Sequence, residues 1–150
     1  MYLPVTTEDL TVPVVTAMSP AALSGTETVL VVEDQIEARS VICETLRRRG
    51  YTVIEAMNGP DAIVKGRQLG VRIDVMLTDV VMPGMGGRRV AEVLRVTRPE
   101  LKVVYMSGYT DSAIVDHGIL EPGVTFVQKP FATETLLRRV REVLDSDKRR

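Results

Sequence analysis

The stretch Asp74-Val-Met-Leu-Thr-Asp79-Val-Val-Met-Pro-Gly-Met-Gly-Gly87 decides the fold of this chain. Its apolar first half predicts a buried parallel strand, and the turn formers Pro83 and Gly84 predict a loop directly after it. The strand delivers one carboxylate, Asp79, to its C-terminal end, which is where ligands bind in open α/β sheets. Asp79 therefore either caps a neighbouring turn or takes part in chemistry.

Alternating strand and helix patterns surround this stretch. Five strands that alternate with five helices through short connections imply a parallel sheet with helices on both faces. Besides the Asp79 strand, β-branched and apolar runs predict strands at residues 28–32, 51–55, 102–106 and 124–128. Apolar periodicity with flanking Gly, Asn and Pro predicts helices at residues 38–46, 58–69, 88–95, 112–117 and 133–144.

The first predicted helix contains the single cysteine of the chain. One cysteine excludes an internal disulfide and a cysteine metal cluster, which fits a reducing compartment. No motif surrounds Cys43, so a packing or surface role is favoured over a nucleophilic one. In the predicted register Cys43 points away from the apolar face, which consists of Ala38, Val41, Ile42, Thr45 and Leu46.

The composition excludes several functional classes. The 19 basic and 20 acidic residues nearly cancel, so no global field favours nucleic acid or an anionic membrane. No apolar stretch approaches the ~20 residues that span a bilayer, and the first residues do not resemble a signal peptide. We therefore expect a cytoplasmic domain at residues 27–145, after a linker or disordered arm at 1–26 and before a tail at 146–150.

Polar side chains end four of the predicted strands: Glu33 and Asp34, then Asp79, Ser107 and Lys129. In a parallel sheet these ends lie at one edge, so the side chains can converge. Three carboxylates repel one another unless a cation lies among them, and oxygen ligands without His or Cys favour Mg²⁺. The alternative is structural: Lys129 pairs with Asp79, and Ser107 caps a helix.

This set of groups suits phosphoryl transfer. A divalent cation, an ammonium group and a hydroxyl together stabilise the negative charge that a phosphoryl group carries during transfer. Asp79 would then be the nucleophile and would form an acyl phosphate.

Residues 27–145 resemble the receiver domain of two-component signalling. Glu33-Asp34 matches the acidic pair of that family, and residues 79–85 match the phosphoacceptor and its loop. Ser107 matches the hydroxyl position, and Lys129-Pro130 matches the lysine with its following proline. The resemblance implies a flavodoxin-like (βα)5 three-layer sandwich with the parallel strand order 2-1-3-4-5.

The resemblance also implies a reaction. A histidine kinase or histidine phosphotransfer domain would pass a phosphoryl group from a phosphohistidine to Asp79. Asp34 and Asp79 would bind Mg²⁺ directly, the main-chain carbonyl of Val81 would be a third ligand, and Glu33 would act mainly through water. A receiver catalyses its own phosphorylation and dephosphorylation and turns over no separate substrate.

A switch is implied as well. Ser107 and Lys129 would hold the phosphoryl oxygens. Phe126 falls at the family's aromatic switch position, and a switch role and a plain core role for it are equally favoured. Movement of Ser107 toward the phosphoryl group would vacate space into which Phe126 turns. These two alternative arrangements of Ser107 and Phe126 would couple phosphorylation of the site to the surface formed by the fourth helix, fifth strand and fifth helix.

The sequence departs from the family in the loop after Asp79. Met85-Gly86-Gly87 lacks the acidic residue that many members have there, which concerns the rigidity of the loop and not the chemistry. Val81 and Tyr109 are apolar or bulky and border the path of the attacking water, so we expect the acyl phosphate to be lost slowly.

The kind of receiver is a separate question. Residues 1–5, 107–110 and 118–123 resemble segments of hybrid histidine kinases, so we expect a receiver from such a kinase, with a stand-alone response regulator as the alternative. Two other classes stay open: an aspartyl phosphohydrolase, which usually has an acid at the position of Val81, and a degenerate receiver that only binds. The family permits a homodimer through its last two helices, which nothing in this sequence requires.

Overall fold

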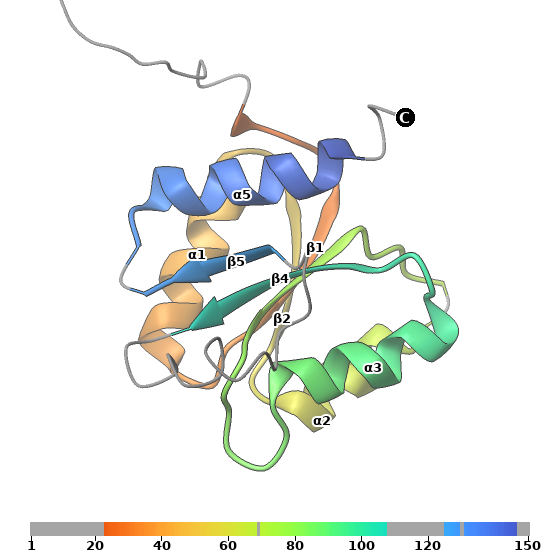
Figure 1. Cartoon of the computed structure of the whole chain (residues 1–150). Coiled ribbons are helices and arrows are strands. Elements are labelled where there is room, and N and C mark those ends of the chain that lie inside the picture. The colour runs from red at the N-terminus through yellow and green to blue at the C-terminus, as the bar shows by residue number, and fades with distance from the viewer. Residues whose placement is uncertain (1–22, 69, 108–124, 130, 147–150) are drawn as a thin grey trace, which may run out of the picture.

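The computed structural model describes residues 23–68, 70–107, 125–129 and 131–146. Within these residues one parallel sheet has the strand order β2-β1-β3-β4-β5 (Figure 1). The expected sheet and its strand order are confirmed. The strands are β1 (Thr28–Val32), β2 (Thr52–Ala56), β3 (Val75–Asp79), β4 (Lys102–Ser107) and β5 (Thr125–Gln128).

Helices cover both faces of the sheet in the described part of the chain. They are α1 (Ile36–Arg48), α2 (Gly59–Gly66), α3 (Gly87–Thr97) and α5 (Thr133–Asp145). Helices α1 and α5 pack on one face and α2 and α3 on the other, which makes three layers (Figure 1). The helix expected at residues 112–117 lies outside the described residues. Of the helices that are described, none combines the length and apolar character needed to cross a bilayer.

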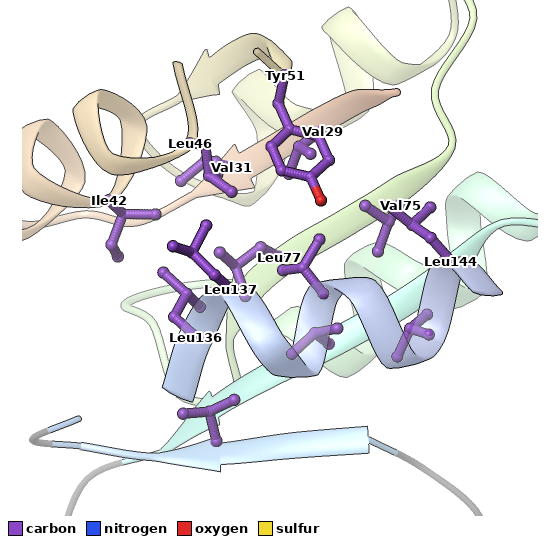
Figure 2. Packing of buried hydrophobic residues seen from close by; sticks show 14 of the residues in the cluster. Val29, Val31, Ile42, Leu46, Tyr51, Val75, Leu77, Leu136, Leu137 and Leu144 are labelled. Atoms are coloured by element: carbon purple, nitrogen blue, oxygen red, sulfur yellow. The ribbon is translucent and has the colours of Figure 1, made fainter. Parts of the chain in front are cut away.

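Strand β1 shows how the two halves of the core divide. Val29 and Val31 pack in the cluster under α1 and α5, which Figure 2 shows from close by. Leu30 and Val32 point the other way and pack in the cluster under α2 and α3. All four side chains are fully buried, as expected for a central parallel strand covered on both faces.

Helix α1 corrects one expectation. Cys43 is buried together with Ile42 and Leu46, whereas Val41 is exposed, so the buried face is turned by about one residue from the expected one. The thiol behaves as a small apolar group that fits against the sheet. Burial raises the pKa of Cys43 to about 11, which leaves the thiol protonated and unreactive.

Helix α2 ends earlier than its apolar period suggests. Asn58 caps its start by accepting a hydrogen bond from the Asp61 main-chain N–H at 2.8 Å, as the sequence indicates. The helix ends at Gly66, and the guanidinium of Arg98 binds main-chain carbonyls at and after this end. Arg98 donates to Gly66 O at 2.7 Å and to Gln68 O at 2.9 Å.

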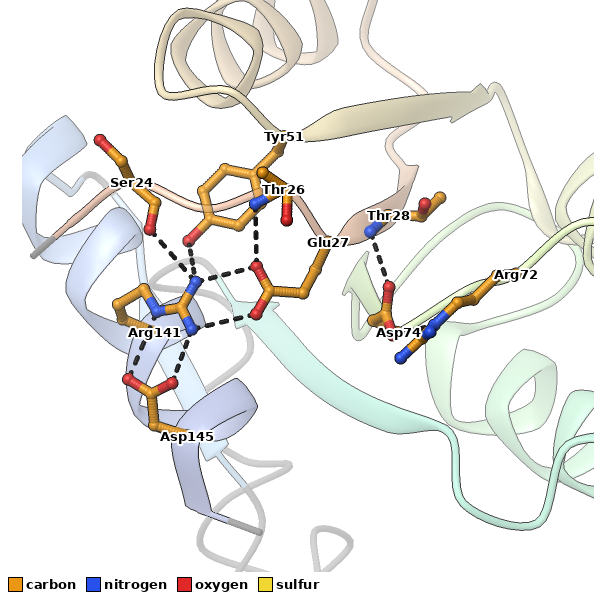
Figure 3. A network of polar contacts seen from close by, with 9 residues as sticks. All are labelled: Ser24, Thr26, Glu27, Thr28, Tyr51, Arg72, Asp74, Arg141 and Asp145. Atoms are coloured by element: carbon orange, nitrogen blue, oxygen red, sulfur yellow. Dashed lines mark hydrogen bonds and ion pairs between the residues drawn. The ribbon is translucent and has the colours of Figure 1, made fainter. Parts of the chain in front are cut away.

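Residues 23–27 pack against the C-terminal part of α5. The guanidinium of Arg141 donates to the Ser24 carbonyl, to the Tyr51 hydroxyl and to the carboxylates of Glu27 and Asp145 (Figure 3). Leu23 lies in the core cluster under α1 and α5, so packing begins before the domain start expected at residue 27. The chain therefore enters the domain through a segment fixed to its last helix.

Candidate functional site

Four strands end at one edge of the sheet and bring their polar residues together. Glu33 and Asp34 follow β1, Asp79 ends β3, Ser107 ends β4, and Lys129 follows β5. Lys129 Nζ lies 2.7 Å from Glu33 Oε1 and 2.7 Å from Asp79 Oδ1. The convergence expected from a parallel sheet is therefore observed for the acidic residues and the lysine.

Three carboxylates, those of Glu33, Asp34 and Asp79, form a cluster, termed the acidic pocket, in which two members are buried and one is exposed. One oxygen from each of Glu33, Asp34 and Asp79 lies within 4.8 Å of the others. Glu33 is 0% exposed and Asp79 is 6% exposed, whereas Asp34 is exposed. A ligand or partner would therefore reach Asp79 from the side of Asp34.

Glu33 is held by several groups of the protein. Its Oε1 accepts a hydrogen bond from Lys129, and its Oε2 accepts one from the main-chain N–H of Gln35 at 3.1 Å. Its own main-chain N–H donates to Ala56 O at 3.2 Å, next to the last rung between β1 and β2. The Glu33 carboxylate is thus turned toward the lysine inside the pocket.

The charges in the pocket do not balance. Burial and the neighbouring Glu33 raise the pKa of Asp79 well above its ordinary value of 3.8, although Lys129 acts in the opposite direction. Burial, followed by Glu33, also raises the pKa of Asp34. One ammonium group faces three carboxylates, so ionisation of all three calls for further positive charge. Hard oxygen donors at an open edge fit a small divalent cation that keeps several of its waters, such as Mg²⁺.

The backbone at Asp79 is fixed by close packing. Thr78 Oγ1 donates to the Asp79 main-chain carbonyl at 3.0 Å. A Cβ added at Gly87 would clash with the same carbonyl oxygen, so only glycine lets α3 begin this close to β3. Gly84, at φ 81°, supplies the left-handed turn between them. The glycines of this loop therefore have a steric role that the sequence comparison with the family did not reveal.

The other expected site residues lie at or near the same edge. Ser107 is buried, and its main-chain carbonyl accepts a hydrogen bond from the Lys129 N–H at 2.6 Å. Val81 is exposed in the loop after β3. Phe126 is half-buried, pairs in register with Tyr105, and packs in the cluster under α2 and α3. The roles of these residues remain predictions, and Tyr109 and Pro130 lie outside the described residues.

Arg39 is a neighbour of the pocket that the sequence motifs did not identify. Its guanidinium donates to the Glu33 main-chain carbonyl at 2.9 Å and lies 3.4 Å from the Glu55 carboxylate. The helical period places residue 39 on the same face as Ile42 and Leu46, which is the signal that could have located it.

Comparisons with known proteins agree with this geometry. A family model described as the response regulator receiver domain matches residues 29–141. The sensor kinase CckA of Brucella abortus is 38% identical over 123 residues, which are 82% of this chain and 13% of that kinase. The solved receiver domain of the hybrid histidine kinase CckA is 34% identical, with a TM-score of 0.65, and the match covers 78% of this chain and 98% of that one. The chemotaxis protein CheY4 of Vibrio cholerae is 30% identical, with a TM-score of 0.69, over 80% of this chain and 100% of that one.

The matches differ in how much of each related protein they cover. The chain spans a small part of the Brucella kinase, yet it matches nearly the full length of both solved structures. The family model covers well over half of the chain and includes β1 to β5 with the acidic edge between them. The chain therefore belongs to the family of response regulator receiver domains of two-component signalling.

Proposed function

We propose that Asp79 of this receiver takes the phosphoryl group in a phosphorelay. The observation that carries the proposal is the buried Asp79 carboxylate, with Lys129 Nζ at 2.7 Å, in a pocket of three acidic residues that opens at Asp34. A carboxylate oxygen of Asp79 would attack phosphorus while the bond from phosphorus to the donor's histidine nitrogen breaks. The product is an acyl phosphate on Asp79 and a neutral histidine on the donor.

The proposed metal-binding roles are those that membership of the receiver family implies. Asp34 and Asp79 would hold Mg²⁺ directly, and the main-chain carbonyl of Val81 would be a third ligand. The carboxylate of Glu33 is engaged by Lys129 and Gln35, which supports an indirect role for it through water. The bound ion would offset the negative charge on the phosphoryl oxygens.

Lys129 and Ser107 would hold the phosphoryl oxygens. Replacing Lys129 with methionine is expected to slow phosphoryl uptake from a small donor about 100-fold, because a fixed positive charge next to the transferred group is lost. Phosphorylation rates measured at saturating Mg²⁺ test this. The matched control is Lys102→Met at the opposite end of β4, which should keep the parent rate. A Lys129→Met rate equal to the parent rate would contradict the assigned role.

The response to phosphorylation is also part of the proposal. Ser107 would move toward the phosphoryl group, and Phe126 would turn into the space that Ser107 leaves. The half-buried position of Phe126 in β5, beside the end of β4, supports this role. The change would reach the surface of the fourth helix, β5 and α5, on which a downstream partner would read it.

The donor is proposed to be a protein. The exposed apolar residues Ile36, Met57 and Val81 all follow the C-terminal ends of strands, at the same edge as Asp79. A histidine kinase or histidine phosphotransfer domain that delivers phosphate to Asp79 would cover them. Similarity to a sensor kinase supports a hybrid histidine kinase as the parent chain, with a stand-alone response regulator as the alternative. Either protein would act in the cytoplasm.

Val81 is expected to prolong the life of the acyl phosphate. Its apolar side chain offers no hydrogen bond to a water that approaches phosphorus. Val81→Asn should shorten the half-life about tenfold, the effect of roughly one positioning hydrogen bond. The half-life is measured from phosphate release after removal of the donor. Val64→Asn on α2 replaces another exposed valine and serves as the control, and an unchanged half-life in Val81→Asn would rule out the idea.

One experiment separates this function from an aspartyl phosphohydrolase. Aspartyl phosphohydrolases usually have an acid two residues after the nucleophile, where this chain has Val81. With Mg²⁺, the protein should accept phosphate from acetyl phosphate and should not turn over a nitrophenyl phosphate ester. Repeated turnover of the ester without a stable phosphoprotein would favour the phosphohydrolase and would contradict the receiver reaction.

A further inference from the structure

Arg39 joins the acidic pocket to the C-terminal part of β2. It lies in α1, and its side chain is 15% exposed. One arm of the guanidinium donates to Glu33 O at 2.9 Å, and Nε faces Glu55 Oε1 at 3.4 Å. Since a guanidinium is planar and rigid, two partners on different sides fix its orientation.

The Glu33 carbonyl belongs to the peptide unit that connects Glu33 to Asp34. Because this unit is planar, holding its oxygen also fixes the nitrogen and Cα of Asp34. Other contacts act on Glu33 itself: its N–H donates to Ala56 O, and its carboxylate accepts from Lys129 and Gln35. Arg39 is therefore placed to fix the backbone from which the exposed Asp34 carboxylate projects at the mouth of the pocket.

Glu55 holds the guanidinium from the other side. Its carboxylate also pairs with Arg47 at 3.0 Å, and its main-chain carbonyl accepts a hydrogen bond from Lys65. The Glu55 carboxylate offsets the charge of Arg39 close to the acidic pocket. The arrangement favours a geometric role for Arg39 over a long-range electrostatic one.

We infer that Arg39 is a positioning residue that, through the main-chain carbonyl of Glu33, sets Asp34 for binding Mg²⁺. This inference rests on the proposed function. Geometry and charge predict opposite results when Arg39 is removed. If its positive charge mainly repels a cation, its removal strengthens Mg²⁺ binding; if it positions Asp34, its removal weakens binding.

The test compares Arg39→Met with the parent protein by calorimetric titration with Mg²⁺. Loss of a contact that orients a ligand should raise the Kd for Mg²⁺ about tenfold. The Mg²⁺ concentration for half-maximal phosphorylation should rise by the same factor, while the rate at saturating Mg²⁺ stays near the parent rate. Arg48→Met removes an exposed arginine from the same helix and should leave both values unchanged.

Two further variants keep the test informative if Arg39→Met does not fold. Arg39→Lys keeps the charge and one donor, so its Kd should lie between those of the parent and Arg39→Met. Glu55→Gln loosens the guanidinium and should raise the Kd for Mg²⁺ by a smaller factor than Arg39→Met. In the double variant Arg39→Met/Glu55→Gln, the loss of binding free energy should be smaller than the sum of the losses in the two single variants. A parent-like or tighter Kd in these Arg39 variants would overturn the inference. A parent protein that binds no Mg²⁺ and takes no phosphoryl group would instead contradict the proposed function.

Discussion

Replacing Arg141 with methionine is expected to lower the free energy of unfolding by about 3 kcal/mol. The Arg141 side chain is 8% exposed and binds Glu27 at 2.9 Å and Asp145 at 2.6 Å. Removing one partner of a buried ion pair typically costs about 3–5 kcal/mol, because the remaining charge is left uncompensated. The lower end applies here because Glu27 and Asp145 both retain contact with water.

Urea unfolding followed by circular dichroism measures this difference. The control is Arg138→Met, which removes an exposed arginine of the same helix that pairs only with Glu134 among the salt bridges of the described residues. Such an exposed pair contributes about 0.5 kcal/mol or less. If the two variants lost the same stability, the Arg141 network would not fix residues 23–27 to α5.

The same network predicts a pH dependence. Burial raises the pKa of Glu27, but the hydrogen bonds and charge of Arg141, together with main-chain N–H groups, outweigh it and bring the pKa below its ordinary value of 4.5. The stability from Glu27 is therefore present above pH 4.5 and is lost as the pH falls through the lower, folded pKa. The Arg141→Met variant lacks this contribution, so acid should destabilise it less than the parent protein in that range.

The central strands and their polar ends could be predicted from the sequence. β1 was expected at residues 28–32 and is observed there, because an apolar run this short, followed at once by Glu33 and Asp34, fits a strand covered on both faces. Parallel topology then forces the strand ends to one edge, which brings Asp79 and Lys129 together. The acidic pocket is therefore predictable from the sequence alone.

Contacts between distant parts of the chain could not be predicted. Arg141 binds Glu27 across 114 positions, and Arg98 binds the last carbonyl of α2 from 32 positions away. No local pattern marks either arginine, since both resemble ordinary surface charges in the sequence. The buried face of α1 also differs from the predicted one: Cys43 lies on it and Val41 does not, because the sheet accepts the thiol as a small apolar group.

Asp79→Asn is expected to abolish phosphoryl uptake completely. The asparagine amide has nearly the same shape, but it lacks the anionic oxygen that attacks phosphorus. The substitution also removes one negative charge from a pocket in which burial and Glu33 already disfavour the Asp79 carboxylate. Without Mg²⁺, the variant should therefore melt at or above the temperature of the parent protein, and unfolding would not explain its inactivity.

A matched control separates this loss from a general effect of aspartate replacement. Asp61→Asn, on α2, removes an acidic group that pairs with Lys65 and does not belong to the three-carboxylate cluster. This variant should keep the parent extent of phosphorylation. Loss of phosphorylation in Asp61→Asn as well would point to a change of fold and not to the chemistry of one carboxylate.

The most direct test of the account is the intact mass of the protein after incubation with acetyl phosphate and Mg²⁺. We predict one added phosphoryl group on the parent chain, labile to base, absent without Mg²⁺ and absent from Asp79→Asn. A parent chain that stays unmodified under these conditions, or a phosphoryl group that persists in Asp79→Asn, would contradict the assignment of Asp79 as the phosphoacceptor.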